Sequence, residues 1–178
     1  MGHYGKHLLH VQRHVGYNIA PAAGFMIALL QRVTEARVEV DRKVVAQIAS
    51  GLLVLLAVEP GDESAQAERI AERILGYRVF PDADERMNLS LLDTGGGLLL
   101  VPQFTLAADT RKGMRPSFTG AASPEQGKAL FDYTVGRVRA RLGDRLAIGV
   151  FGAHMRVSLT NDGPVTFWLR AEPGTPTG

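Results

Sequence analysis

The sequence predicts an α+β domain in which two main helices pack on a mainly antiparallel sheet. Runs of apolar and β-branched residues of strand length recur along the chain, whereas only two segments have the apolar spacing of an amphipathic helix. The 178 residues are enough for one domain with a sizeable core and too few for two. No apolar run approaches the roughly 20 residues of a membrane-spanning helix, so we expect no membrane partner.

The two ends of the chain differ in composition from the rest. Residues 1–25 contain four of the five histidines, interrupted by glycine and proline and without a periodic apolar face. We expect a flexible N-terminal extension, or an upstream start codon read through, so this segment need not be native and metal binding by its histidines would be incidental. Residues 26–170 then form the domain, and residues 171–178 form a flexible tail.

The first part of the domain predicts three strands. Residues 27–40 interleave β-branched residues with charges, which is typical of a strand or a bent pair of strands. Residues 44–48 form a second strand, and Gly51 turns the chain into a third, from Leu52 to Val58. Because that third run is apolar without interruption, we expect a central strand covered on both faces.

A helix is expected after Pro60-Gly61-Asp62, with Asp62 as its N-cap. Its apolar stripe comprises Ala67, Ile70, Ala71 and Ile74. We expect a strand near residues 77–80, a turn at residues 81–84, and a further strand over residues 98–104 after the flexible joint Gly95-Gly96-Gly97.

The second helix has the clearest start in the sequence. Ser123-Pro124-Glu125-Gln126 is a capping box with proline at the first helical position, and Gly143 ends the helix. Its apolar positions are Phe131, Val135, Val138 and Leu142. Two final strands are expected over residues 149–159 and 165–169, joined by a turn at residues 161–164.

Composition excludes several kinds of chemistry. The absence of cysteine removes disulfides, thiolate zinc sites and a cysteine nucleophile, and it suits a cytoplasmic location. The net charge of +2 comes from Lys6 and Arg13, because the remaining 18 basic and 18 acidic residues cancel. A neutral domain argues against a protein that coats long DNA or RNA but permits one that grips a short nucleic-acid end.

No cofactor or metal site is expected, because the domain has no cluster with ligand spacing and no nucleotide-binding fingerprint. Its only histidine, His154, alternates with Phe151 and Met155 along an expected strand. Phe151 and Met155 lie on the apolar face, so His154 is expected to point to solvent and not to serve as a catalytic base. An enzyme of this composition would have to rely on backbone groups and on its substrate.

Two segments carry the most specific pattern. They are Val101–Thr110, followed closely by Gly113–Phe118, and Val157–Thr166. As a pair they resemble the two signature motifs of the D-aminoacyl-tRNA deacylases. Further matches are Gln31–Val33, Gly76–Phe80 and Met87–Ser90, and the resemblance covers Met26 to Leu169.

The resemblance implies a homodimeric hydrolase with a barrel-like β core that acts at the 3′ end of aminoacyl-tRNA. Each active site would receive Gly163 and Pro164 of the partner subunit, joined by a cis peptide bond that proline makes accessible. Their carbonyl groups would accept hydrogen bonds from the ammonium of a D-amino acid, whereas an L side chain would collide with them. Glycine, which has no side chain, would pass.

The resemblance also implies roles for further residues. Gln103, Phe104 and Thr105 match the catalytic segment beside the terminal adenosine, where backbone N–H groups would stabilise an oxyanion and the adenosine 2′-hydroxyl would assist the attacking water. The other expected substrate-binding residues are Pro102, Met114, Phe151 and Met155. Arg111, Lys112 and Arg115 flank the expected adenosine site, so we expect them to contact tRNA phosphates; the alternative is that they are solvated loop charges.

One position departs from the family pattern. Pro102 stands where the family usually has serine, which removes a hydroxyl group and a backbone donor. A related subgroup of relaxed chirality also has Pro-Gln there. Two alternatives therefore stay open: a deacylase of relaxed chirality that acts on L-aminoacyl-tRNA, and a non-catalytic nucleic-acid-binding module on the same fold.

Overall fold

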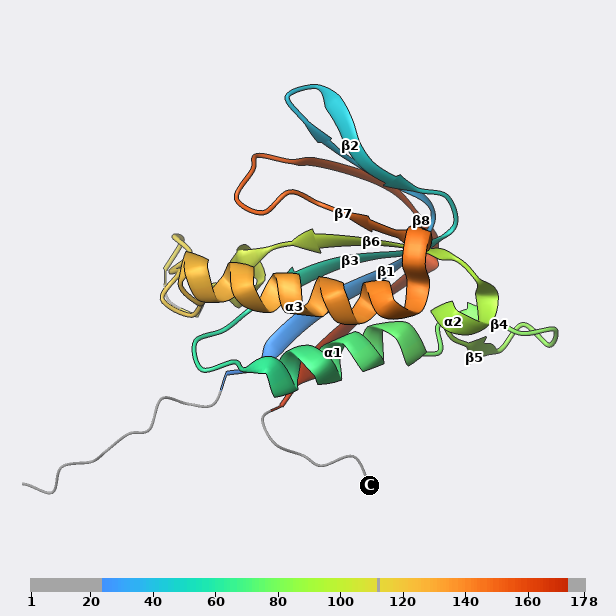
Figure 1. Cartoon of the computed structure of the whole chain (residues 1–178), viewed down its shortest axis with the longest axis horizontal. Coiled ribbons are helices and arrows are strands. Elements are labelled where there is room, and N and C mark those ends of the chain that lie inside the picture. The colour runs from blue at the N-terminus through green and yellow to red at the C-terminus, as the bar shows by residue number, and fades with distance from the viewer. Residues whose placement is uncertain (1–23, 112, 173–178) are drawn as a thin grey trace, which may run out of the picture.

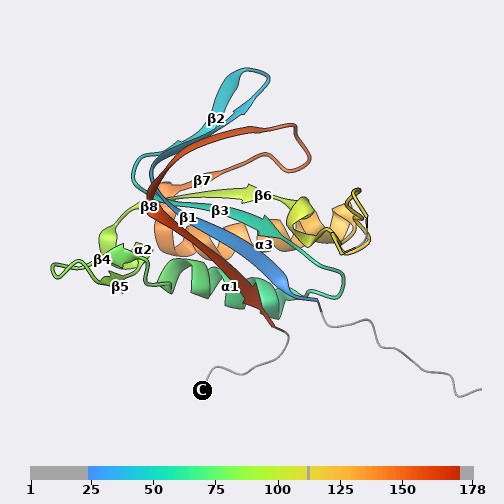
Figure 2. The same cartoon turned by 180° about the vertical axis from the view of Figure 1, so that it is seen from behind.

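The computed structural model describes residues 24–111 and 113–172. Most of the expected extension, most of the expected tail and Lys112 therefore lie outside the described residues. Six strands form one sheet that curls into a nearly closed, barrel-like shape, and two long helices cover one of its faces (Figures 1 and 2). The strands are β1 (Met26–Val40), β2 (Lys43–Ile48), β3 (Gly51–Ala57), β6 (Gly97–Pro102), β7 (Leu146–Ile148) and β8 (Arg156–Ala171).

The sheet is mainly antiparallel, as predicted, because β1 pairs antiparallel with β2, β3 and β8. Two parallel pairings, β3 with β6 and β6 with β7, were not foreseen. Parallel neighbours need a crossover connection, and a long helix supplies each one. The first helix, α1 (Ser64–Gly76), lies between β3 and β6 in the chain, and the second, α3 (Pro124–Leu142), lies between β6 and β7.

The strand predictions hold best in the first part of the domain. The strands expected over residues 27–40, 44–48 and 52–58 are confirmed, and β3 lies in the middle of the sheet with both faces covered. The strand expected over residues 98–104 ends earlier, because Gln103 leaves the extended conformation and the short 3-10 helix η1 (Phe104–Ala107) begins.

Two other strand predictions were wrong. The segment near residues 77–80 is mostly irregular: Tyr77 ends α1, and only the short β4 (Phe80–Pro81) pairs, with β5 (Met87–Leu89). Residues 149–155 form a turn between β7 and β8 instead of a strand. The left-handed Gly152, at φ 76°, bends the chain there.

The predicted turn at residues 161–164 lies inside β8. This strand pairs with β1 on both sides of the turn, with Asn161 opposite Val33 and Thr166 opposite Gln31. Residues 162–165 have no partner in β1 and form a bulge opposite Arg32. The Gly163–Pro164 segment is therefore a projection from a continuous strand.

Helix α1 begins one residue later than predicted. Its N-cap is Glu63, whose side chain forms a reciprocal capping box with Gln66. Asp62 instead turns inward, where its carboxylate accepts a 2.7 Å hydrogen bond from the N–H of Glu59. The predicted inner stripe is buried, and it comprises Ala67, Ile70, Ala71 and Ile74.

Helix α3 begins and ends as predicted. The Ser123 side chain accepts the N–H of Gln126 at 3.2 Å, and Gly143 follows the last turn with φ 56°. The Gln126 side chain does not complete the capping box. It donates to the carbonyl of Asp62 at 3.0 Å, which ties the start of α3 to the loop before α1. The short helix α2 (Leu91–Thr94) was not predicted.

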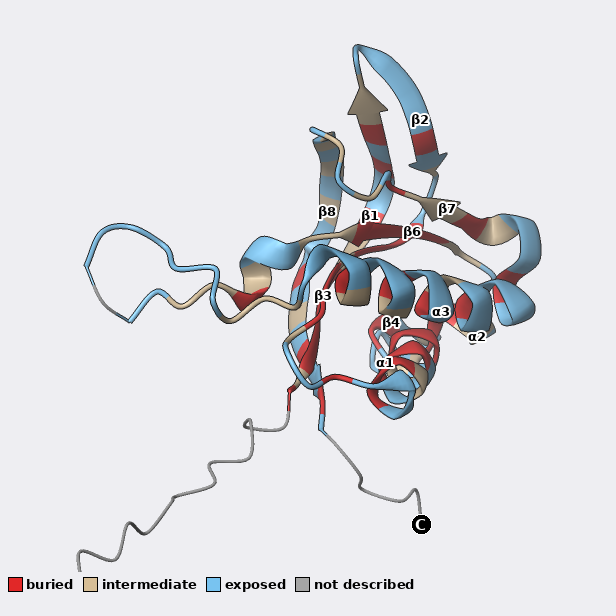
Figure 3. Ribbon diagram, turned by 60° about the vertical axis from the view of Figure 1, so that its left-hand side comes forward, coloured by how far each residue is buried: buried red, intermediate tan, exposed pale blue. Residues whose placement is uncertain are grey.

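The main core lies between the helices and the sheet, and a second apolar cluster covers the other face of the strands (Figure 3). The strands approach closely where Gly51 pairs with Gly97: a Cβ atom on Gly51 would lie 1.9 Å from the Gly97 carbonyl oxygen. Among residues 24–111 and 113–172, no helix is long and apolar enough to cross a membrane.

Candidate active site

A cavity of about 450 Å³ opens at the carboxyl end of β6. Its walls come from the ends of β3 and β6, the first turn of α3, and the turn that leads into β8. The lining residues are Leu56, Ala57, Val58, Val101, Pro102, Gln103, Phe104, Ala122, Ser123, Pro124, Gly127, Phe131, Phe151, Gly152, Ala153, His154, Met155 and Val157.

The cavity brings together most of the residues that the sequence assigned to substrate, namely Pro102, Gln103, Phe104, Phe151 and Met155. Other expected site residues do not line it. Thr105 is exposed beside it, hydrogen-bonded through its hydroxyl to the Gln103 side chain. Met114 is fully exposed, and Gly163 and Pro164 are exposed in the bulge of β8.

The first wall forms where β6 ends. The N–H of Gln103 donates to the Leu56 carbonyl at 2.7 Å, which holds the strand end against β3. The chain then turns into η1, whose first N–H groups have no carbonyl in their own helix to bind. Among the described residues, neither the N–H of Phe104 nor that of Thr105 has a hydrogen-bond partner. Two backbone donors are thus free at the cavity rim.

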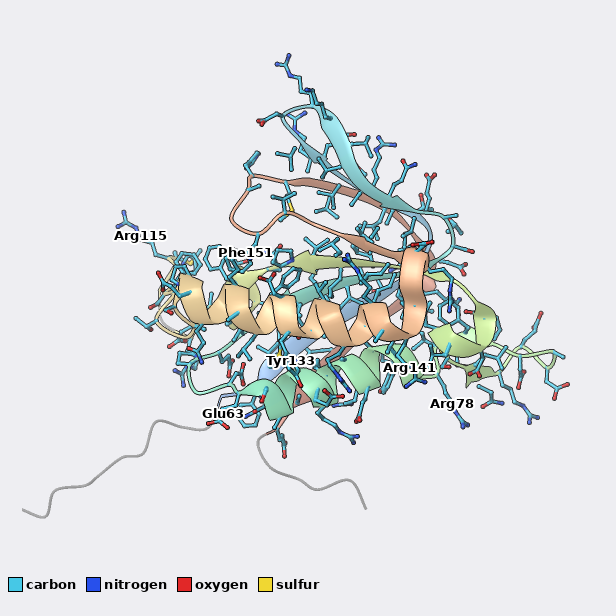
Figure 4. The ribbon with its side chains drawn as sticks, viewed as in Figure 1. Glu63, Arg78, Arg115, Tyr133, Arg141 and Phe151 are labelled. Atoms are coloured by element: carbon cyan, nitrogen blue, oxygen red, sulfur yellow. The ribbon has the colours of Figure 1, made fainter. Side chains whose placement is uncertain are left out.

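The opposite wall depends on Gly149. Its N–H donates to the Leu100 carbonyl at 2.8 Å, and a Cβ atom there would lie 3.1 Å from the Met155 sulfur and 3.3 Å from Pro102. Glycine therefore lets the turn rest directly on these two side chains. Phe151 lies on the same turn beside α3 (Figure 4). Its ring packs against Phe131, with centroids 6.2 Å apart.

The lining is largely apolar and carries little charge. None of the described residues that line the cavity is a carboxylate, and its one ionisable side chain is His154. His154 is exposed, as predicted, but it lies on the cavity wall, a placement that the sequence did not indicate. Within the described part of the chain, no three His, Asp or Glu residues are grouped as a metal site would require.

Two polar side chains brace the bulge around Gly163 and Pro164. The peptide bond between these residues is cis. Asn161 spans the bulge: its Oδ1 accepts the N–H of Val165 at 2.7 Å, and its Nδ2 donates to the Val165 carbonyl at 3.2 Å and the Thr166 hydroxyl at 3.1 Å. The bulge is thus closed on itself by one amide group.

Arg32 braces the same bulge from β1. Its Nε donates to the Asp162 carbonyl at 3.1 Å and lies 3.0 Å from the Asp162 carboxylate, while Nη1 donates to the Val79 carbonyl at 2.7 Å. The Arg32 side chain is only 11% exposed, whereas the Asp162 side chain is 50% exposed, so the carboxylate end of the ion pair stays open to water. Sequence reasoning missed the roles of Arg32 and Asn161, although both lie in segments that match the family.

The loop after η1 carries the expected phosphate ligands. Arg111 forms a two-pronged ion pair with Asp109, at 2.9 and 2.8 Å. The guanidinium holds the pKa of Asp109 well below its usual range, and the carboxylate raises the pKa of Arg111. The charge of Arg111 is therefore largely neutralised, whereas Arg115 projects away from the fold (Figure 4). Lys112 lies outside the described residues.

A buried carboxyl group lies in the loop before α1, which Gln126 of α3 contacts. Asp62 is 3% exposed, and its Oδ1 has no hydrogen-bond partner among the described residues. Burial raises the pKa of Asp62 to about 6, the hydrogen bond from the Glu59 N–H opposes that rise, and the negative charge of Glu59 adds to it. The folded protein therefore retains this proton at pH values where the unfolded chain loses it.

The first prediction concerns stability against pH. Because the pKa of Asp62 is raised in the folded protein, this group adds to the free energy of unfolding at low pH. Its contribution is fully present below about pH 4 and is lost as the pH rises through about 6. We expect the wild type to lose roughly 1–2 kcal/mol relative to Asp62→Asn between pH 4 and 7, after allowance for solvent screening. Urea unfolding of both proteins across that range measures the difference. A pH-independent difference would contradict the assignment.

Known proteins resemble this chain over nearly the whole domain. A family model described as D-Tyr-tRNA(Tyr) deacylase matches residues 29–170. A D-aminoacyl-tRNA deacylase of Thioalkalivibrio sulfidiphilus is 64% identical over 148 residues, which cover 83% of this chain and 99% of the relative. A protein of the same name from Methylococcus capsulatus is 61% identical over 153 residues, 86% of this chain and 99% of the relative.

Solved structures share the fold. The c-Myc DNA Unwinding Element Binding Protein is similar with a TM-score of 0.77 and 33% identity, over 85% of this chain and 99% of that one. A probable eukaryotic D-amino acid tRNA deacylase has a TM-score of 0.71 over 82% of this chain and 99% of its own. Because the sequence identity is only 19%, this similarity is evidence about the fold alone.

Proposed function

The chain belongs to the D-Tyr-tRNA(Tyr) deacylase family and is a D-aminoacyl-tRNA deacylase, and we propose from this premise how it selects and cleaves its substrate. The bond cleaved is the ester between a D-amino acid, or glycine, and the 3′-terminal adenosine of tRNA. The observation that carries the proposal is the position of two free backbone donors, on Phe104 and Thr105, at the rim of the largely apolar cavity.

The ester carbonyl oxygen binds these two N–H groups, which stabilise the negative charge that develops as water adds to the carbonyl carbon. The bond to the 3′-oxygen then breaks, the water oxygen stays on the released amino acid, and a proton from the attacking water passes to the 3′-oxygen of the adenosine, which becomes a hydroxyl group. The adenosine 2′-hydroxyl assists the attacking water. This role for the substrate suits a cavity whose described lining carries no carboxylate.

Chiral selection is assigned to the bulge of β8, acting in the cavity of the partner subunit of a homodimer. The bulge is exposed, it is braced by Arg32 and Asn161, and Gly163 and Pro164 do not line the cavity of their own subunit. Carbonyl groups of these two residues accept hydrogen bonds from the substrate ammonium. An L side chain would meet the same backbone and be excluded.

The location and the partners follow from this role. The protein acts in the cytoplasm, where aminoacyl-tRNA is used, and DNA is not a substrate. Arg115 supplies a phosphate contact, because its loop flanks the cavity and Arg111 is already paired with Asp109. Pro102 lines the cavity in place of the family's usual serine, so discrimination against L substrates is the property that most needs measurement.

Deacylation assays test the proposal. The purified chain should hydrolyse D-Tyr-tRNA and Gly-tRNA, leave L-Tyr-tRNA intact, and keep its rate in EDTA. Equal rates on the D and L substrates would contradict chiral selection. RNA binding without hydrolysis of any of the three would favour a non-catalytic binding module, and a competing DNA duplex that inhibits hydrolysis would contradict the exclusion of DNA.

A further inference from the structure

Two exposed aromatic rings lie side by side at the cavity rim. Phe104 is 58% exposed and Phe118 is 47% exposed. Their ring centroids are 5.3 Å apart and their planes are inclined by 58°. Phe104 lines the cavity, whereas Phe118 lies beyond it. Single exposed apolar residues are ordinary, but adjacent large rings beside a substrate cavity indicate a contact surface.

The fold holds Phe118 in place. Asp109 and Ser117 exchange two backbone hydrogen bonds, at 2.8 and 3.0 Å, which close the loop that precedes the ring. On the other side, a Cβ atom on Gly120 would lie 2.4 Å from the Ala107 carbonyl oxygen, so the chain there rests directly on η1. The ring is therefore preorganised, which lowers the entropic cost of binding.

The geometry favours a nucleobase as the occupant. Every base has a flat π-face and stacks on aromatic side chains irrespective of sequence. The two rings are too strongly inclined to enclose one base between them, so each presents a separate face. The surroundings suit a phosphate backbone, because Asp109, the one acid in residues 108–122, is paired with Arg111, while Arg115 projects from the same loop.

We propose that Phe118 stacks on the unpaired base immediately 5′ of the terminal adenosine of the tRNA. This inference rests on the proposed function, in which the cavity beside Phe104 receives that adenosine. The chain of the nucleic acid then leaves the cavity over Phe104, reaches Phe118 at the next nucleotide, and passes its phosphate toward Arg115. Phe118 thereby distinguishes a tRNA end from an isolated aminoacyl-nucleoside, which lacks the preceding base.

The test compares two substrates on the full chain: D-Tyr-tRNA, and D-tyrosyl-adenosine, which lacks the preceding nucleotide. Phe118→Ala should lower kcat/KM for the tRNA at least about 5-fold, mainly through KM, and change the nucleoside ester less than about 2-fold. Phe118→Trp should retain activity on both. Tyr133→Ala, which removes an exposed aromatic of α3 that bonds Glu68 of α1 and does not line the cavity, is the matched control and should change neither.

Equal losses on both substrates would mean that Phe118 only supports Phe104 and would overturn the proposal, as would no loss on either. Light scattering that showed Phe118→Ala to be monomeric while the wild type is dimeric would overturn it too, because the partner subunit would then cover the ring.

Calorimetry with the trinucleotide CCA and with adenosine tests the stacking of Phe118 independently of the proposed deacylase activity. If the wild type hydrolyses neither ester, tighter binding of CCA that Phe118→Ala abolishes still supports stacking, and equal binding overturns it.

Discussion

Replacing Gly163 with alanine should reduce kcat/KM for D-Tyr-tRNA by at least about 100-fold while the protein stays folded. Gly163 has φ 137°, a conformation that residues with a side chain rarely adopt. A Cβ atom there would lie 2.5 Å from the Val165 side chain and 3.0 Å from the Val165 nitrogen. The bulge must therefore shift, and displacement of groups around a reacting centre by about 1 Å can cost about 100-fold in rate.

The same displacement should lower the ratio of D to L activity, because the moved carbonyl groups no longer exclude the L side chain. Steady-state kinetics with D-Tyr-tRNA and L-Tyr-tRNA measure both effects. Gly95→Ala is the matched control: Gly95 also has positive φ, at 70°, but has open space around it at the end of α2. Full activity and an unchanged D to L ratio in Gly163→Ala would contradict the role of the bulge.

Filling the cavity should be equally damaging. Gly127 faces it from the first turns of α3, and a Cβ atom there would lie 3.6 Å from the Phe151 ring, an ordinary contact distance. The ring of Gly127→Phe would therefore extend into the space assigned to the substrate. We expect kcat/KM to fall at least about 100-fold, with a melting temperature equal to or above that of the wild type because glycine in a helix interior is unfavourable by about 1 kcal/mol.

The same helix offers the control. Gly136 has nothing within 4 Å of an added Cβ atom, so Gly136→Phe introduces the same side chain into solvent and should leave activity unchanged. Gly127→Ala should keep activity within about 3-fold, because its methyl group fits against Phe151. Normal kinetics in Gly127→Phe would mean that the substrate binds elsewhere.

Strong local signals made some of the fold predictable. The uninterrupted apolar run of β3 and the capping residues of α3 are local patterns that predict those elements without reference to distant contacts. The parallel pairings and the short β7 depend on how two crossover helices pack, which no local pattern encodes. The turn over residues 149–155 was mistaken for a strand because the apolar residues Phe151, Ala153 and Met155 alternate along it, although Gly152 bends its backbone.

The candidate site was predictable where motif residues are adjacent in sequence. Pro102, Gln103 and Phe104 come together because β6 ends there. The Arg32 contact could not be read from the chain, because the residue lies 130 positions from Asp162 and looks like one of several charges in an alternating strand. The sequence did indicate a special role for Gly127, since a glycine inside a helical pattern often marks a close approach of another group.

We propose that each active site combines the cavity of one subunit with the bulge of the other. Mixed dimers of Gly127→Phe and Gly163→Ala are the sharpest test of this shared site. Each variant alone is expected to be nearly inactive, but a mixed dimer contains one site with an intact cavity and the partner's intact bulge. Random association should then restore about a quarter of wild-type kcat/KM on D-Tyr-tRNA. Activity no higher than the average of the two separate variants, in samples shown to contain mixed dimers, would contradict the shared site.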